Sequence, residues 1–554
     1  MHIVLNSSNI VKFNFNPKLV KFQDDNFVYE NDSFKVICEG IIYNSLDLLR
    51  ESNKDSLYDL ILDLFSNGGV ASIMNALHGC YAIAIYDKQE DILYITNDLL
   101  SKKPIYYASE QVKIVVSTSF YDCVDEAKSL GISLEMDEFG VNEMLENGVF
   151  TLDNTYYEQI HFLTHMQYMI IGGGKVELAN AEYITKKNSL GNITESVEYV
   201  DTLFRNSCRQ AAEKNAKAGY LPVFSLSAGM DSRCSFLAGV DYAKDFSGKV
   251  PFCFSYGISG CNDLKIASQI ADIYNCDFHA ANINKENYLL DRDELLSVNE
   301  GQMHYQGTTG LRRLIDRIDT SNIGLVFTGI GGGECMGDLR HPSGEKSGWE
   351  KLLKEFYKNL CSDNRIDQIV AKAVDEYGSF NEFIGLQDIR TCLNFHFSSR
   401  DKFEFFSPYL DEDFFMTLLK LPYEWVGKRK LYTEWYVSRF GLDLPTTYEY
   451  FQGNIRKYKL NPAYRYLMSF KHLLFGTGKS WIMNPTDLSI CKSDNVLRVL
   501  DEDFAVDMKG LNSCEAGEKL RSEYKLSNDS LQRKLGVLTV SGVLKYTERI
   551  RINE

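Results

Sequence analysis

The sequence predicts an α/β protein of two domains: a strand-rich, layered domain followed by a doubly wound parallel-sheet domain with helical additions. Residues 1–187 contain short apolar runs separated by polar turns, a pattern typical of buried and half-buried strands. Beyond residue 192, apolar strands alternate with helical patterns, which favours a parallel sheet with helices on both faces. The chain has 554 residues, more than one hydrophobic core usually organises.

The first domain is expected to hold several short strands and a helix near residues 55–65. The clearest strand segments are VICEGIIYN (36–44), CYAIAIYD (80–87), DILYITND (91–98) and KIVVSTS (113–119). The stretch SLGNITES (189–196) is rich in turn and cap residues and opens a helical pattern over 197–212. We therefore place the domains at 1–192 and 193–460, with a mainly helical C-terminal extension of the second domain at 461–554.

The second domain repeats a strand–loop–helix pattern. Strands are expected at LPVFSLS (221–227), PFCFSYG (251–257), DFHAANI (277–283) and IGLVFTG (323–329), with a helix over 263–274. From about residue 349 the pattern is mostly helical. Parallel sheets bind ligands at the carboxyl ends of their strands, and two small-residue turns lie at such ends here.

Composition narrows the class of function. Hydrophobic residues make up 44% and charged residues 24% of the chain, which is typical of a globular protein. The net charge of −17 argues against a nucleic-acid or anionic-membrane surface, so we expect a small-molecule or peptide substrate. No apolar run approaches the length of a membrane span, so no membrane insertion is expected.

Cysteine and histidine usage favours a cytoplasmic protein without a zinc motif. The 13 cysteines form no CxxC pair, and several lie in apolar strand-like runs, as reduced core thiols do. The N-terminal residues lack the pattern of a secretory signal. His161 and His165 have HxxxH spacing but lack the glutamate of a zinc-binding helix, so we interpret the spacing as chance.

The strongest local motif is SAGMDS at 227–232, directly after an apolar strand and directly before a helix. Small residues let backbone N–H groups surround a phosphate, and the helix N-terminus adds partial positive charge. Ser227 and Ser232 can donate hydroxyls to phosphate oxygens, while Asp231 is suited to a Mg²⁺ between phosphates. The alternative is an ordinary strand-to-helix turn in which Asp231 or Ser232 caps the helix.

The neighbouring segments favour the phosphate interpretation. SLSAGMDSR resembles the SGGxDS pyrophosphate loop of the asparagine synthetase family. The resemblance continues in order through four further segments: FSYGISGCNDLKIASQIADIYNCDFH, FTGIGGGECMGD, FFSPYLDEDF and GKRKLYTEWYVSRFGLDLP. In the first half, EGIIYNSLDLLRE resembles the NGEIYN segment of class II glutamine amidotransferases. The family implies an αββα, Ntn-type glutaminase-like domain and an ATP pyrophosphatase domain.

The amidotransferase-like half departs from the family pattern in its catalytic residues. The family uses an N-terminal cysteine as nucleophile, but residue 2 is His2 and no cysteine precedes Cys38. Glu39 replaces the asparagine of the oxyanion hole, where a carboxylate would repel the developing charge. Asn97 replaces the arginine of the family's RD pair, although Asp98 remains. These losses predict that glutaminase activity is absent; an imidazole nucleophile at His2 is the alternative.

The synthetase-like half departs as well. The family's GxGxDE element reads GIGGGE at 329–334, so Ile330 and Gly333 stand where acidic residues are expected. Only Glu334 survives. We predict that Asp231 and Glu334 hold the metal and that both are catalytic, together with a lysine that stabilises the adenylate. Lys457 is the candidate by location, with Lys459 and Lys430 as alternatives.

The resemblance also implies a nucleotide site and a reaction. The predicted nucleotide-binding residues are Leu226, Ser227, Gly229, Asp231, Ser232, Tyr256, Thr328 and Gly329. The implied function is an ATP- and Mg²⁺-dependent, AMP-forming carbon–nitrogen ligase that adenylates a carboxylate and forms an amide with ammonia or a substrate amine. A homodimer is compatible with the resemblance. Alternatives are uronic-acid amidation in surface polysaccharide synthesis, ring closure as in lasso-peptide cyclases or β-lactam synthetases, and a non-catalytic pseudoenzyme.

Overall fold

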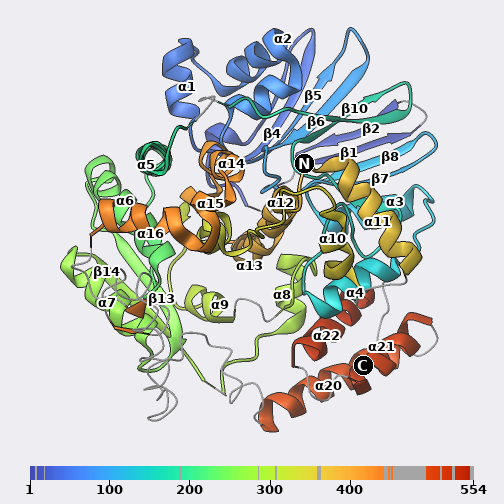
Figure 1. Ribbon diagram of the computed structural model, residues 1–554. Coiled ribbons are helices and arrows are strands. Elements are labelled where there is room, and N and C mark those ends of the chain that lie inside the picture. Colours follow the sequence, from blue (N-terminus) through green and yellow to red (C-terminus); the bar gives the residue numbers. More distant parts are fainter. Residues whose placement is uncertain are drawn as a thin grey trace.

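The fold is known from a computed structural model of the chain. The structure describes residues 1–6, 9–15, 17, 19–185, 190–284, 286–305, 309–358, 363–441, 447–448, 451–452, 494–511, 515–526 and 531–548. Three sheets organise these residues (Figure 1). Two lie within residues 2–180, here called the first half, and one lies within residues 223–406, in the part here called the second half. A separate two-stranded hairpin joins β17 (Thr447–Tyr448) and β18 (Phe451–Gln452).

Two antiparallel sheets face each other in the first half. One has the order β2-β1-β8-β7-β9 and the other β11-β10-β6-β5-β4-β3. Alternating apolar side chains of both sheets meet in a common core that includes Ile3, Ala82, Ile95 and Val116. The strands are β1 (His2–Asn6), β2 (Asn9–Asn14), β3 (Phe27–Glu30), β4 (Phe34–Ile42), β5 (Gly79–Asp87), β6 (Ile92–Asn97), β7 (Tyr106–Glu110), β8 (Lys113–Ser117), β9 (Ile160–Phe162), β10 (Gln167–Gly172) and β11 (Lys175–Asn180).

Helices cover the outer face of each sheet. On the six-stranded sheet, α2 (Leu57–Ala76) buries Leu60, Ile61 and Ile73 against strand residues, and α1 (Ser45–Ser52) lies beside it. On the five-stranded sheet, α3 (Phe120–Ser129) and α4 (Glu138–Glu146) pack in a second core. The first half therefore has four layers, helix–sheet–sheet–helix, which confirms the predicted αββα arrangement.

The second half contains a five-stranded parallel sheet with the order β14-β13-β12-β15-β16. Its strands are β12 (Val223–Ser225), β13 (Phe252–Ile258), β14 (Asp277–Ile283), β15 (Leu325–Phe327) and β16 (Glu404–Phe406). The chain proceeds outward from β12 to β14 and then returns to the other side of β12 for β15 and β16. This reversal makes the sheet doubly wound, as predicted, with its topological switch point between β12 and β15.

Local signals set the helices around this sheet. The helix α5 (Ile193–Lys217) extends beyond the predicted 197–212 at both ends. Its earlier start follows from Asn192, whose side chain accepts a hydrogen bond from the backbone of Glu195 and caps the first turn. The helix α6 (Met230–Ser247) ends at Gly248, which adopts φ +62 as left-handed helix caps do. The helix α7 (Asn262–Ile273) follows β13.

The rest of the described chain is mainly helical. It comprises α8 (Arg292–Asn299), α9 (Thr309–Ile315), η2 (Glu334–Asp338), α10 (Glu350–Tyr357), α11 (Asp363–Glu376), α12 (Phe380–Cys392), α13 (Asn394–Ser399), η3 (Pro408–Leu410), α14 (Glu412–Lys420), α15 (Tyr423–Val426), η4 (Gly427–Arg429), α16 (Lys430–Arg439), α20 (Asp494–Gly510), α21 (Glu515–Leu526) and α22 (Leu531–Thr547). None of the helices in the described ranges is long and apolar enough to cross a bilayer.

The last helices pack on the first half of the chain as well as on the second. Figure 1 shows α20, α21 and α22 beneath α4. Val537, Leu538 and Val540 of α22 share a core with Met144 and Leu145 of α4. A Cβ at Gly536 would lie 2.9 Å from the Cα of Leu145, so glycine permits this close contact. The predicted boundaries at 192 and 460 stay predictions.

Candidate functional site

The loop after β12 lies at the switch point of the parallel sheet and closes on itself through two serines. The backbone N–H of Ser227 donates to the hydroxyl of Ser232 over 3.0 Å, and the two hydroxyls lie 2.8 Å apart. The N–H of Gly229 donates to the Ser227 hydroxyl. Gly229 is the N-cap of the 18-residue helix α6. It has no side chain that could accept hydrogen bonds from the first N–H groups of the helix. The N–H of Ala228 donates to the buried carboxylate of Asp263 over 2.8 Å. The loop lies at a helix N-terminus, as anion-binding loops do, and phosphate binding by it stays a prediction.

The glycine-rich turn after β15 packs directly against this loop. A Cβ at Gly329 would lie 2.1 Å from the backbone nitrogen of Ser232, and a Cβ at Gly332 would lie 2.6 Å from the Cβ of Asp231. Gly331 has φ +81, which favours glycine. Backbone contact favours glycine at 329, the Asp231 side chain favours it at 332, and the positive φ favours it at 331. The two predicted segments therefore lie side by side.

Asp231 is the buried acid of this site. Burial raises the pKa of its carboxyl to about 6, while a hydrogen bond from Tyr432 and the charge of Arg429 lower it and the charges of Glu334 and Asp338 raise it. The Tyr432 hydroxyl donates to Asp231 Oδ1. Three carboxylates therefore act on one another here, an arrangement that a cation would stabilise.

Asp338 and Arg429 occupy the space beside the lost acidic position. Arg429 Nε donates to Asp338 Oδ1 over 2.6 Å, and a second contact joins Nη2 to Oδ2. A Cβ at Gly333 would lie 2.7 Å from Arg429 Nη2 and 2.8 Å from Asp338 Oδ2. Lys428 and Arg429 both adopt φ +57, an unusual backbone for residues other than glycine. This pair replaces a side chain at 333 and was not predicted.

Glu334 is exposed and lies near Asp388 and Cys392. Its carboxylate, the carboxylate of Asp388 and the thiol of Cys392 have ligand atoms within 4.8 Å of one another. Burial raises the pKa of Asp388 to about 7, and the charge of Glu334 adds to the shift. Glu334 also contributes to the pKa of Asp231, so it is electrostatically part of the site. Its role as a second metal ligand stays a prediction.

The other predicted nucleotide residues lie along the same strand ends. Leu226 follows β12, and its N–H donates to the carbonyl of Phe254 in β13. Tyr256 lies in β13, and its ring packs against Gly310. The hydroxyl and N–H of Thr328 both donate to the carbonyl of Phe406, which leaves the backbone after Thr328 facing the loop.

Of the three candidate lysines, the structure describes only Lys430. Lys457 and Lys459 lie outside the described residues. The Nζ of Lys430 donates to the carbonyl of Glu424 over 3.3 Å. Arg429, its neighbour in the sequence, is the cation that acts on Asp231.

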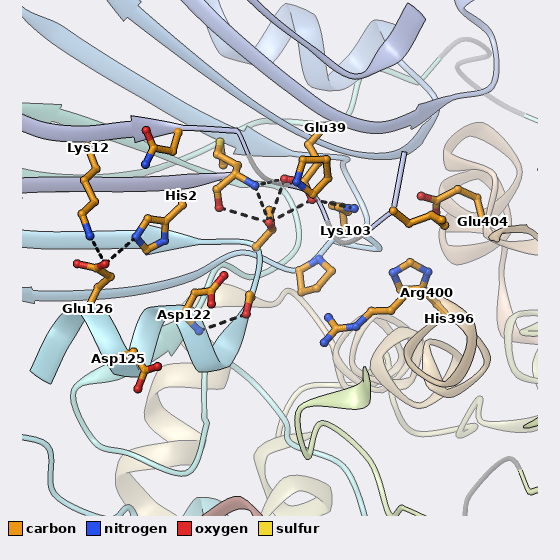
Figure 2. Close-up of a pocket in the computed structure, with 17 residues that line it drawn as sticks. His2, Lys12, Glu39, Lys103, Asp122, Asp125, Glu126, His396, Arg400 and Glu404 are labelled. Carbon is orange, nitrogen blue, oxygen red and sulfur yellow. Dashed lines mark hydrogen bonds and ion pairs between the residues drawn. The ribbon is translucent and has the colours of Figure 1, made fainter. Parts of the chain in front are cut away.

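The first half contains a second candidate site, a pocket of about 350 Å³ (Figure 2). Glu39 extends into it and forms contacts with the amine of Met1, with Thr118, and with Lys103 at 3.1 Å. His2 Nε2 lies 3.5 Å from Glu126, which also binds Lys12. Both predicted departures, His2 and Glu39, therefore line one pocket, and each is held by charged neighbours.

Asn97, the third departure from the family pattern, and its neighbour Asp98 both bind the backbone at residues 102–103. Asn97 Nδ2 donates to the carbonyl of Lys103 over 2.8 Å. The carboxylate of Asp98 accepts from the N–H groups of Lys102 and Lys103. His161 and His165 do not share a ligand: His161 Nδ1 lies 3.2 Å from Asp153, and His165 Nδ1 lies 2.8 Å from the Leu100 carbonyl.

Comparison with known proteins gives similarity to both halves. A glutamine amidotransferase domain matches residues 21–184. A putative asparagine synthetase (glutamine-hydrolyzing) of Methanocaldococcus jannaschii is 23% identical over 352 residues, covering 60% of this chain and 58% of the relative. A probable asparagine synthetase of Acanthamoeba polyphaga mimivirus is 25% identical over 365 residues, covering 62% of each chain. The asparagine synthetase of Rattus norvegicus is 23% identical, covering 57% and 58%.

The extent of these matches is partial. The chain spans about three fifths of the length of the first of these relatives. Among solved structures, a glutamine phosphoribosylpyrophosphate amidotransferase from B. subtilis, complexed with ADP and GMP, matches at 10% identity with a TM-score of 0.20 and covers 56% of this chain and 59% of its own. So low a TM-score supports no argument about the site.

Proposed function

We propose that this chain, which is similar to asparagine synthetases, is an ATP-dependent ligase that adenylates a carboxylate and forms an amide. The observation that carries the proposal is the position of Asp231. Its buried carboxylate lies in a serine- and glycine-rich loop at the switch point of a parallel sheet, within the fields of Glu334 and Asp338. Such a loop suits pyrophosphate, and such a carboxylate group suits Mg²⁺.

The donor set fits a magnesium–nucleotide complex. Mg²⁺ prefers carboxylate oxygens and phosphate oxygens, and Asp231 and Glu334 would hold it in this chain. When bound, the ion would neutralise charge on the pyrophosphate. Ser227 and Ser232 would orient phosphate oxygens through their hydroxyls, and the N-terminus of α6 would add its N–H groups.

The proposed chemistry has two steps. A carboxylate oxygen of the substrate attacks the α-phosphorus of ATP, and pyrophosphate leaves. An amine then attacks the acyl carbon, AMP leaves with the C–O bond electrons, and the amine loses a proton. Lys457 is proposed to stabilise the adenylate and the oxyanion of the second step, as a positioned cation can.

The amine is proposed to be ammonia or a substrate amine, because the first half lacks the residues for glutamine hydrolysis. Glu39 stands where an oxyanion-hole asparagine is expected, and its carboxylate already binds Lys103. An imidazole at His2 is the residual alternative nucleophile, and it lies against Glu126. The carboxylate substrate is proposed to be aspartate, a uronic acid or a peptide derivative.

A non-catalytic pseudoenzyme is the second candidate, and one observation favours it. Asp231 has protein partners of its own, since Tyr432 donates to it and Arg429 acts on it electrostatically. A carboxylate with such partners has a structural role without any metal. The Arg429–Asp338 pair occupies the space that a side chain at Gly333 would need, which also favours a pseudoenzyme.

Calorimetry of ATP binding with and without Mg²⁺ separates the two candidates. For the ligase we expect the parent to bind ATP more tightly with Mg²⁺, and Asp231→Ala to remove that difference. Asp241→Ala, on the exposed side of the same helix, is the control and should behave as the parent. Equal ATP affinity with and without Mg²⁺ in the parent, together with no pyrophosphate release across a panel of carboxylates, favours the pseudoenzyme.

A further inference from the structure

Three metal-ligand side chains meet between the two halves of the chain. Cys80 comes from β5, His396 from α13 and Glu404 from β16. One ligand atom of each lies within 4.8 Å of the others, and all three residues are buried. The three residues belong to separate elements, so their meeting depends on how the first-half sheet packs against the parallel sheet.

Two of these side chains are buried without a hydrogen-bond partner. His396 is 2% exposed and Glu404 is 5% exposed. His396 Nδ1 and Glu404 Oε2 have no partner among the described residues. A buried polar atom without a partner is destabilising, so such atoms are uncommon unless an ion or water binds them.

The protonation of the cluster is compatible with a metal ligand set. Burial lowers the pKa of His396 well below its ordinary value, which keeps the ring in the neutral, ligating form. Burial raises the pKa of Glu404 and of the Cys80 thiol.

Two cations lie beside the cluster, and both have acidic partners. Lys103 pairs with Glu39 at 3.1 Å, and Arg400 lies 2.9 Å from Glu300. Both cations still act on the cluster, because their charges add to the lowering of the His396 pKa. Figure 2 shows Lys103, His396, Arg400 and Glu404 together at one end of the pocket.

The pocket supplies access for the ion. His396 and Glu404 line the cavity of about 350 Å³, while Cys80, with 0% exposure, lies behind them. A metal held by these three residues would keep a further coordination position toward the pocket. Three protein ligands with one open position are typical of zinc sites that bind water or a small ligand.

We propose that Cys80, His396 and Glu404 form a zinc-binding site that joins β5 of the first half to α13 and β16 of the second. A thiolate, an imidazole and a carboxylate together suit Zn²⁺ better than Mg²⁺ or Ca²⁺, which prefer oxygen ligands. Binding releases the thiol proton of Cys80 to solvent, and no electron is transferred. The site is independent of the proposed ligase activity.

The test measures zinc on the full-length chain. The purified protein is loaded with Zn²⁺, dialysed and analysed for metal, and we expect one tightly held ion per chain. Replacing it with Co²⁺ should give the absorption of a thiolate-bound cobalt ion. If the parent retains no zinc, or if the cobalt form lacks thiolate absorption, the proposal is overturned without any variant.

Variants then assign the ligands. Cys80→Ser and His396→Gln should each weaken zinc binding by roughly 100-fold, and Glu404→Gln by at least roughly tenfold. His78→Gln and Cys253→Ser, also buried but outside the cluster, should bind as the parent does. Zinc should raise the unfolding temperature of the parent and of both controls only. Loss of zinc in the His78 or Cys253 control, with retention in Cys80→Ser, would place the ion elsewhere and overturn the assignment.

Discussion

The hydroxyl of Tyr432 in α16 donates a hydrogen bond to the carboxylate of Asp231 at the start of α6. The two residues are 201 positions apart in the sequence, and their contact fixes the acid of the phosphate-type loop in one orientation. The bond favours the ionised carboxylate, whereas burial favours the protonated form and sets the pKa at about 6. Tyr432 therefore lowers the pH at which Asp231 ionises, against the larger and opposite effect of burial.

Tyr432→Phe should shift Mg²⁺-dependent ATP binding to higher pH. Without the hydroxyl the pKa of Asp231 rises above about 6, so the carboxylate is protonated at pH values where the parent is ionised. Calorimetry of Mg-ATP binding between about pH 5 and pH 8 measures the shift. Tyr436→Phe is the matched control, because the Tyr436 hydroxyl contacts Arg233 instead. Identical pH profiles for Tyr432→Phe and the parent would contradict the prediction.

Glu334→Gln should lower pyrophosphate exchange by about 100-fold if Glu334 takes the place of the acid lost at Gly333. The glycines before it allow the backbone to bring the carboxylate toward the loop. Asp338→Asn is the informative comparison, because Asp338 pairs with Arg429 beside Gly333. An unaffected Glu334→Gln beside an inactive Asp338→Asn would assign the second carboxylate to Asp338.

Purified protein should release no glutamate from glutamine in the presence of ATP. By the resemblance to amidotransferases, Glu39 replaces the oxyanion-hole asparagine, and a carboxylate there would repel the developing charge. Lys103 lies 3.1 Å from this carboxylate. Glutamate is measured enzymatically over several hours, with heat-denatured protein as the background. Turnover that disappears in His2→Ala would show instead that the imidazole acts as a nucleophile.

Stability should fall as the pH rises from about 6.5 to about 9 through the loss of charge on His78. Burial alone would lower the pKa of His78, but the carboxylates of Asp411, Glu412 and Asp413 outweigh it and raise the pKa to about 9. The folded-state pKa lies above the unfolded value, so this stabilisation is full below pH 6.5 and is lost through pH 9.

Urea unfolding at several pH values measures the effect. His78→Gln should reduce the slope of stability against pH in this range. His161→Gln is the control, because His161 is partly exposed and pairs with Asp153 away from this cluster. A slope unchanged by His78→Gln would mean that another group causes the loss.

The sequence predicted the sheets and the loop because their signals are local. The apolar runs of β12, β13 and β15 are recognisable as strands, and small-residue turns follow them. The hydrophobic pattern and the turn residues together suffice to place these turns at one edge of the sheet. The four-layer arrangement of the first half followed from the resemblance and agrees with the structure.

The surroundings of Asp231 could not be predicted in the same way. Tyr432 and Arg429 approach it because α16 packs against α5 and the loop after β12, and a hydrophobic pattern shows that a helix is buried without showing against what. Asp338 lies only four residues beyond Glu334, but the kink at Gly337, with φ +112, decides where its carboxylate points. The cluster of Cys80, His396 and Glu404 depends on domain packing for the same reason.

The packing of α22 against α4 has a consequence for synthesis on the ribosome. Residues 120–146 form α3 and α4 early, but the apolar surface that these helices bury against Val537, Val540 and Val543 stays uncovered until nearly the whole chain has emerged. During that interval the nascent chain carries an exposed hydrophobic surface, the kind that chaperones bind and that drives aggregation. A premature stop codon before residue 531 would remove α22 and with it these three apolar partners of α3 and α4.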